Sequence, residues 1–417
     1  MLNQNGVRGV RFYSMFSNTV NLYRQSFSGL NTSVWFLSLI NLINRAGTMV
    51  VPFMTMYITQ SLHMSLTRAG FVLTCFGTGA IIGALIGGRL TDLFGHYKVQ
   101  LLTLFFGGLS FILLGQLKDY SAICMMTFIL ALINEAFRPA NMSAIGLYST
   151  PENRTRSSSL VRLSVNLGWA VGATAGGFLA AINYQLLFWV DGLTNILAAV
   201  CLFFVLKPTG VKHRTSTDDE LVAKPATQDR VFMIFVLLSF MFALSFFQIF
   251  STYPVYLKNE LHITEQHIGW IFALNGLLIA LFEMIIISSL SGRGRELKFI
   301  SSGLVLTGLS FVILNVPLHF AVLTGLLSCL FFTAGEILSM PFMMTFWMNR
   351  TDHSNRGQYA GYYTISYSAA HISGPFLGSL IADHWGFQIL WYVVFVFCLL
   401  TFWGFRVLNK MEPSNAV

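Results

Sequence analysis

Acidic residues are absent from the first 91 positions of this chain, and Asp92 is the first one. Charged residues of both signs make up only 10% of the 417 residues, whereas 55% are hydrophobic. A soluble globular domain carries about 25% charged residues, so this composition excludes one. A chain this apolar is expected to lie in a membrane, where the positions of the basic residues report orientation. We therefore do not read the net charge of +8 as a sign of a nucleic-acid partner.

Several patterns of enzymes and pumps are also missing. No G-x-x-x-x-G-K-[ST] phosphate-binding loop occurs, which argues against an ATP-driven pump. The loops hold no nucleophile–base or metal-ligand constellation, so we expect neither an enzyme nor a bound cofactor or metal. The cysteines lie in apolar stretches, at spacings that match no disulfide or metal framework: Cys75, Cys124, Cys201, Cys329 and Cys398.

Long apolar runs are what the chain has in abundance. A bilayer-spanning helix needs about 20 apolar residues, and long runs favour helices over a β-barrel. We therefore predict an all-α membrane protein with twelve transmembrane helices, at residues 34–59, 68–91, 97–117, 121–148, 157–181, 184–206, 231–257, 266–290, 298–316, 320–347, 358–381 and 386–408.

One long hydrophilic stretch interrupts these runs. Residues 207–230 are rich in charge, Thr and Pro, which is typical of a linker. We therefore predict five parts: a basic N-terminal segment (1–32), a six-helix half (33–206), the linker (207–230), a second six-helix half (231–409) and a tail (410–417). The basic start fits a cytoplasmic N-terminus; an organellar transit peptide is the alternative. No signal-peptide pattern precedes Val34.

The distribution of basic residues predicts the orientation. If both termini are cytoplasmic, 19 of the 25 lysines and arginines fall on the cytoplasmic side and three on the opposite side. The other three lie within apolar segments. Because cytoplasmic loops carry an excess of Lys and Arg, we expect both termini in the cytoplasm.

The two halves repeat each other in sequence. At an offset of 202, Pro139 matches Pro341 and Arg154 matches Arg356. Further matches occur at offsets of 202 and 199, between Gly172 and Gly374, Gly176 and Gly378, Gly70 and Gly269, Gly77 and Gly276, and Gly95 and Gly294. Two six-helix halves related in this way are known in one large class of secondary transporters.

A short signature lies between the second and third apolar runs. It reads GGRLTDLFGHYK over residues 87–98, with the pattern Gly88-x-Leu90-x-Asp92-x-x-Gly95-x-x-Lys98. This resembles the loop 2–3 signature of the major facilitator superfamily (MFS) of secondary transporters. Together with the twelve segments and the repeat, the resemblance covers about residues 33–408.

The resemblance implies the MFS fold and a conformational latch formed by Gly88, Asp92, Gly95 and Lys98, which stabilises the outward-facing state. Asp92 would pair with a base or with a helix N-terminus of the opposite half. The second copy of the signature, at 291–294, has lost the acid because Ser291 stands where Asp92 would be. Any charged latch is therefore built on Asp92.

Glycines repeat every fourth position in two segments. They predict close helix packing at Gly168, Gly172 and Gly176 in the fifth segment and at Gly374, Pro375 and Gly378 in the eleventh. The fifth segment resembles the antiporter motif of drug-efflux MFS members, with Ala173 in place of its proline. The stretch from Phe137-Arg138-Pro139-Ala140 to Asn153-Arg154-Thr155-Arg156 also looks like the drug:proton antiporter branch.

Ionisable residues inside membrane segments are costly and are candidates for function. We expect a cavity that is basic on the N-terminal side and acidic on the C-terminal side. The candidate solute-binding residues are Asn41, Arg45, Arg138, Asn166, Glu336 and His371, and the candidate proton-coupling residues are Glu135, Glu336 and His371. Arg162 shares a helix face with Asn166. As alternatives, Glu135 pairs locally with Arg138, Glu283 only reaches toward the cytoplasmic surface, His371 is a buried helix contact, and Asp191 is a packing acid.

These observations lead to one main functional hypothesis. It is a proton-driven, alternating-access transporter of a small organic solute, with efflux of drug-like compounds or metabolites as one candidate activity and no cofactor beyond the proton gradient. The alternative is an uptake symporter for a peptide, an amino acid or another zwitterionic or anionic solute. Asn41-x-x-Asn44-Arg45-x-Gly47 resembles the helix 1 signature of proton-coupled oligopeptide transporters, although both of its glutamates are Asn here.

The expected setting follows from the same hypothesis. We expect a monomer in the lipid bilayer of a bacterial inner membrane, with a small solute and protons as its partners. A membrane enzyme or a non-transporting receptor is the third hypothesis. A channel is disfavoured, because a two-half repeat with a latch implies gating from alternate sides of the membrane.

Overall fold

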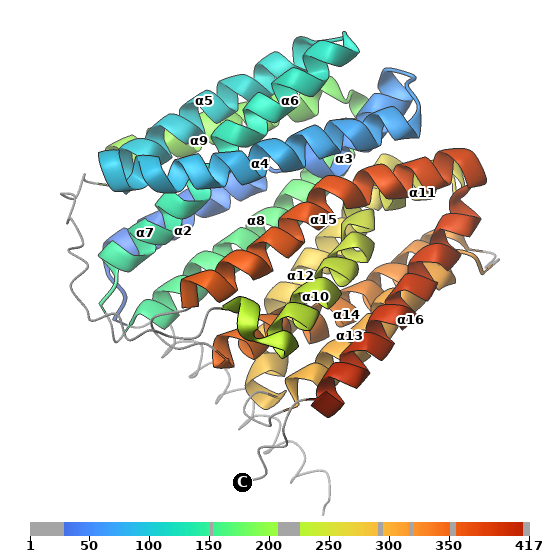
Figure 1. Ribbon diagram of the computed structural model, residues 1–417. Coiled ribbons are helices and arrows are strands. Elements are labelled where there is room, and N and C mark those ends of the chain that lie inside the picture. The colour runs from blue at the N-terminus through green and yellow to red at the C-terminus, as the bar shows by residue number, and fades with distance from the viewer. Residues whose placement is uncertain are drawn as a thin grey trace, which may run out of the picture.

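The computed structural model describes residues 29–150, 153–206, 226–290, 295–316, 320–350 and 356–411. Parts of the predicted N-terminal segment, linker and tail, and the second copy of the signature at 291–294, lie outside these residues. In the described part every regular element is a helix (Figure 1), which confirms the all-α prediction.

The first half contains α2 to α9. Its elements are α2 (Thr32–Ala46), α3 (Val50–Met56), the π-helix η1 (Tyr57–Ser61), α4 (Leu66–Phe94), α5 (His96–Gln116), α6 (Tyr120–Glu135), α7 (Phe137–Tyr148), α8 (Arg154–Ile182) and α9 (Gln185–Val205). We call this group the N-half.

The second half, the C-half, repeats this plan. After the 3-10 helix η2 (Ala226–Gln228) come α10 (Arg230–Phe246), the 3-10 helix η3 (Phe247–Phe250), α11 (Thr252–Asn259), α12 (Glu265–Leu290), α13 (Glu296–Ile313), α14 (Ala321–Asn349), α15 (Arg356–Trp385) and α16 (Phe387–Met411). Figure 1 shows the halves side by side, with α4 and α8 of the N-half next to α15 and α12 of the C-half.

Eleven helices in the described ranges are long and apolar enough to cross a membrane. The twelfth expected span, α15, has 30 residues but is less apolar than the other eleven. Its sequence is rich in Ser, Tyr and Gly. Since α15 packs against α4, α10 and α16, protein neighbours rather than lipid surround much of it, and a polar composition is tolerated there.

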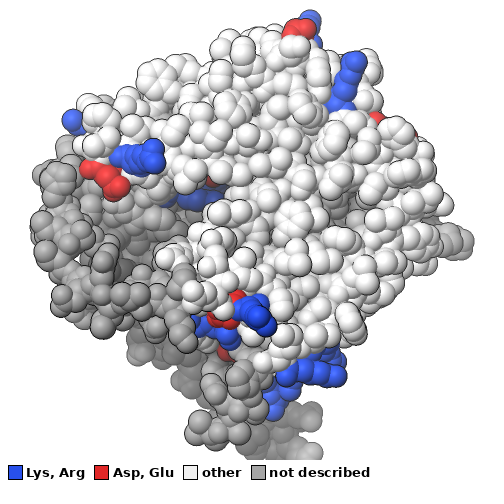
Figure 2. All heavy atoms as spheres, in the orientation of Figure 1, with Lys and Arg blue, Asp and Glu red and all other residues white. Residues whose placement is uncertain are grey.

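Apolar side chains also cover the outside of the bundle. Leu85, Phe204 and Trp403 expose 68%, 79% and 68% of their surface, which a soluble protein would avoid over so wide an area. Figure 2 shows the broad middle of one face without charged side chains, which gather toward its two ends. The molecule therefore presents an apolar belt of the kind that lipid requires.

The two sides of the bundle are named here by their turns. The termini side holds the start of α2, the turn at Gly95 and the end of α16 (Figure 1). The far side holds the turns that follow Ser61, Gln116 and Ile182. Three spans are broken near their middle or toward one end: α2–α3, α6–α7 and α10–η3–α11.

Within the N-half, α4 lies against α6 in a parallel arrangement. A methyl group added at Gly79, Gly83 or Gly87 would meet the backbone of Phe128, Leu132 or Ala136, respectively. Each contact keeps the same offset of 49 residues, so the two helices stay in register over more than two turns. Only glycine permits this approach.

Candidate functional site

The candidate site is the boundary between the halves, where most of the intramembrane charges lie. It has two clusters. The first joins Arg45, Glu135 and Arg138 of the N-half to His371 of the C-half, because each lies within electrostatic reach of others in the group. The second joins Arg162 of the N-half to acids of the C-half.

The first cluster is built at two helix breaks. Arg45 stands in the last turn of α2, and its Nε is buried without a hydrogen-bond partner among the described residues. Glu135 ends α6, and Pro139 is the third residue of α7, in a first turn whose N–H groups have no carbonyl partner within the helix, so its missing N–H costs little. The Arg138 Nε lies 3.9 Å from the Glu135 Oε2, and 70% of the Arg138 side chain is exposed. The local ion pair suggested by the sequence is therefore present.

His371 meets this cluster from α15. Its ring stacks on Phe247 with centroids 4.4 Å apart and meets Phe76 edge-on at 5.9 Å. Phe247 belongs to the C-half and Phe76 to the N-half. The imidazole is therefore held between aromatic rings of both halves. This fits the interpretation of His371 as a buried helix contact, and it also fits a role that depends on the relative position of the two halves.

The second cluster crosses the boundary directly. Arg162 on α8 donates through Nη2 to the Glu283 Oε1 on α12. Glu283 is only 5% exposed. The alternative interpretation, in which Glu283 reaches toward the cytoplasmic surface, is therefore wrong. Glu336 on α14 lies within electrostatic reach of Arg162 and accepts a hydrogen bond of 3.2 Å from the Asn275 Nδ2. Sequence reasoning had not singled out Asn275.

The remaining candidate solute ligands differ in their surroundings. Asn41 is 1% exposed, and its amide donates to Leu37 O at 2.8 Å and to the Asn141 Oδ1 at 2.9 Å. In this conformation that amide connects helices within the N-half. Asn166 is half-buried on α8, one turn after Arg162. Their assignment as solute ligands stays a prediction.

Asp191 supports the break in the first span. Its Oδ2 accepts the backbone N–H groups of Met49 and Val50 at 3.3 and 3.2 Å. These donors have no carbonyl four residues back because the helix is interrupted after Ala46. Asn195 holds the same carboxylate at 3.1 Å. Asp191 therefore acts as a packing acid that fixes the backbone next to Arg45.

The predicted latch residues lie at the termini side. Gly88, Asp92 and the following two residues still belong to α4, and only Gly95, at φ +83°, lies outside a helix. Asp92 and Lys98 are exposed. The neighbouring His96, which the sequence reading passed over, is buried and lies 3.2 Å from the Tyr148 hydroxyl through Nε2.

The glycine stripes pack within their own halves. A methyl group at Gly168, Gly172 or Gly176 would meet α2 or α3, for example Ala46 O at 3.0 Å from Gly172. In the C-half, Gly374 lies against Leu244 O, and Gly378 lies against the Gln248 side chain. The two stripes therefore occupy equivalent places, on the first span of each half.

Among the described residues, the hydrogen bonds between the halves concentrate on the far side. On the far side, Gln60 bonds to Asn259, Thr67 to Asp383 and Tyr184 to Glu265. Toward the termini side, α4 and α15 separate, since a methyl group at Gly88 or Gly361 would meet nothing within 4 Å. The far side is thus closed.

Comparison with known proteins decides the family. The family model described as Major Facilitator Superfamily matches residues 34–375. The chain belongs to the major facilitator superfamily. As an MFS member it is a multi-pass membrane transporter for small solutes and not an enzyme, which confirms the resemblance seen in its sequence.

Similar sequences carry transporter names. Multidrug resistance protein 2 of Bacillus subtilis (strain 168) is 22% identical over 359 residues, covering 84% of this chain and 88% of that protein. A Na(+), Li(+), K(+)/H(+) antiporter of Planococcus maritimus is 24% identical over 423 residues, covering 93% and 95%.

Solved structures share the fold. The nucleoside transporter NupG superposes with a TM-score of 0.77 at 13% identity, covering 90% of this chain and 100% of that one. A POT family transporter in complex with 5-aminolevulinic acid gives 0.76 at 15% identity, covering 92% and 98%. At these identities the likeness establishes the MFS fold alone.

Proposed function

We propose that this MFS transporter is driven by the proton gradient and moves a small organic solute by alternating access. The observation that carries the proposal is the charge asymmetry of the boundary between the halves. Arg45, Arg138 and Arg162 come from the N-half, whereas Glu283 and Glu336 come from the C-half. Intramembrane charges that face a partner half mark solute and proton pathways.

Glu336 is the proposed main proton carrier. Its carboxylate is half-buried in the bundle and has the Asn275 amide as a hydrogen-bond donor. When Glu336 is ionised, it attracts Arg162 of the opposite half; when it is protonated, that attraction is lost. Proton binding thereby changes the energy of holding the halves together. Glu135 and His371 are the other proposed exchange groups, next to Arg45 and Arg138.

Export is the proposed direction. Relatives with this architecture include multidrug resistance proteins of Bacillus subtilis and an antiporter of Planococcus maritimus, which supports proton-coupled efflux. Uptake of a zwitterionic or anionic solute is the second candidate. It is favoured by the unpartnered Nε of Arg45 and by the similar fold of a POT family transporter that binds 5-aminolevulinic acid.

The proposed cellular setting is a bacterial inner membrane, with both termini in the cytoplasm and the monomer as the working unit. The excess of basic residues on the termini side supports this orientation. The far side would then face outward, and the conformation described above would be open toward the cytoplasm.

Gradient-driven transport in proteoliposomes tests the proton assignment. We expect Glu336→Gln to abolish accumulation or extrusion against a gradient while solute exchange at equilibrium continues. Glu135→Gln should weaken coupling in the same assay. Glu260→Gln, which changes an exposed acid on the far side, is the matched control. If both variants transport like the control, the coupling assignment is wrong. Counterflow with labelled drugs and amino acids separates export from uptake.

A further inference from the structure

A hydrogen-bonded contact on the far side joins the halves through a carboxylate. The Asp383 Oδ2 on α15 accepts the backbone N–H of Thr67 at 2.8 Å and its hydroxyl at 2.6 Å. Thr67 lies in the first turn of α4, whose N-cap is Ser65. The C-half thus supplies a cap to a helix of the N-half.

The position of Asp383 is informative because it is unfavourable for its own helix. It lies in the last turn of α15, which ends at Trp385, where the partial charge of the helix dipole is negative. The first turn of α4, in contrast, offers unpaired N–H groups and a positive partial charge. The acid is therefore stabilised by the opposite half and not by α15.

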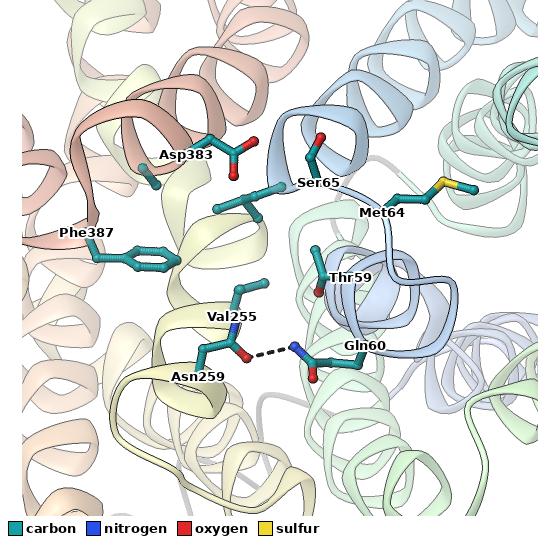
Figure 3. A pocket seen from close by; sticks show the side chains of 10 residues that line it. Thr59, Gln60, Met64, Ser65, Val255, Asn259, Asp383 and Phe387 are labelled. Atoms are coloured by element: carbon teal, nitrogen blue, oxygen red, sulfur yellow. Dashed lines mark hydrogen bonds between the residues drawn. The ribbon is translucent and has the colours of Figure 1, made fainter.

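The surrounding contacts show that this part of the boundary is closed. A methyl group at Gly70, one turn after Thr67, would meet the Ser379 side chain at 2.8 Å. The Gln60 Nε2 donates to the Asn259 Oδ1 at 2.7 Å, also across the boundary. Figure 3 shows this bond at one edge of a pocket and Asp383 at another.

The pocket itself depends on both halves. Its volume is about 310 Å³, and it is lined by Thr59, Gln60, Met64, Ser65 and Leu66 from one half and by Val255, Asn259, Ala382, Asp383 and Phe387 from the other. Any separation of α4 from α15 on the far side would disrupt it and break the Asp383–Thr67 contact.

We propose that Asp383 is the positioning residue of a far-side gate, which holds the halves closed there by capping α4 across the boundary. It would act at the opposite end of the same helix pair from the latch proposed for Asp92. Breaking this cap is then one of the energetic costs of opening the far side. The inference rests on the alternating-access cycle proposed above, but its test requires no transport.

Disulfide cross-linking measures the closed state directly. The five native cysteines are replaced by Ser, and Gln60→Cys and Asn259→Cys are introduced at the contact of 2.7 Å. Copper-phenanthroline should link them rapidly in membranes. Adding Asp383→Ala should lower the cross-linking rate, because the loss of one cap, worth about 1 kcal/mol, shifts the closed–open equilibrium constant roughly fivefold toward the open state.

A matched control separates gating from helix stability. Asp119 caps α6 on the same side, accepting the Ala122 N–H at 2.9 Å, but entirely within the N-half. Asp119→Ala should leave the cross-linking rate unchanged. An equal decrease in both variants, or none in Asp383→Ala, would overturn the proposal.

A second variant tests the contact itself. Thr67→Val removes the hydroxyl donor and should reproduce part of the decrease. Combined with Asp383→Ala, it should add little, because both changes remove the same interaction. Fully additive effects would contradict the proposal. Unchanged transport with a reduced cross-linking rate would count against the proposed cycle but not against the gate contact.

Discussion

Arg162 of the N-half and Glu283 of the C-half form an ion pair in which the acid is 6% exposed and the base 51% exposed, by side chain. Removing the base leaves a buried carboxylate without its partner. We expect Arg162→Gln to destabilise the protein by about 2 kcal/mol, a value limited by the solvent around the guanidinium. Thermal unfolding in detergent measures this loss.

Two variants complete that experiment. Lys118→Gln changes an exposed base on the far side and should have no measurable effect. Exchanging the charges, with Arg162→Glu and Glu283→Arg together, should recover part of the stability. If the double variant loses as much stability as Arg162→Glu alone and Glu283→Arg alone added together, the ion pair contributes nothing.

Asp92→Asn tests the proposed latch. Asp92 is exposed in this conformation, so the substitution should leave stability and solute binding unchanged here. Loss of a helix-end charge interaction worth about 1 kcal/mol shifts a two-state equilibrium roughly fivefold. We therefore expect slower transport with a solute Kd unchanged within about twofold. An equal loss of binding would count against the latch.

Two glycines of α4 provide a matched pair of substitutions. Gly83→Ala would place a methyl group against the backbone of Leu132, whereas Gly88→Ala would meet nothing within 4 Å. The first should cost about 2 kcal/mol through overpacking, and the second should leave the unfolding temperature unchanged. Equal unfolding temperatures for both variants would show that α4 and α6 can separate without cost.

The termini side of the C-half should lose stability in acid. Burial raises the pKa of Asp229, but hydrogen bonds from Arg350, the Phe232 N–H and Tyr359 outweigh it, and the pKa lies below its ordinary value. The contribution is therefore complete above the unfolded-state pKa of about 3.9 and is lost as the pH falls through the lower folded-state value.

Asp229→Asn removes this dependence. Its unfolding temperature should fall below that of the unsubstituted protein at pH 7, and the difference should shrink as the pH approaches 3. A constant difference over that range would mean that the ionised form of Asp229 adds no stability.

Hydropathy and the internal repeat were enough to predict the fold. Long apolar runs leave few alternatives to membrane helices, and the placement of the spans agreed with the helices to within a few residues. The α15 helix is less apolar than the other spans because protein neighbours surround much of it. The sequence of one segment does not reveal which helices will pack around it.

The site was only partly predictable. The Glu135–Arg138 contact is local in the sequence, so a spacing of three residues was enough to predict it, although a helix break lies between them. Arg162 shares a face with Asn166, but spacing does not reveal which helix lies opposite, and its partner Glu283 is 121 residues away. For the same reason the contact of Asp191 with the N–H groups of Met49 and Val50 could not be predicted. Nothing in the sequence around Asp191 indicates that the first span is broken between α2 and α3.

The in-register packing of α4 on α6 has a mechanical consequence. Gly87 touches Ala136, the residue that follows Glu135, and Asp92 lies little more than one turn farther along α4. Because the two helices touch backbone to backbone along this line, we expect them to move together. We therefore predict that a displacement of the α6–α7 junction is passed along α4 to Asp92 at the termini side.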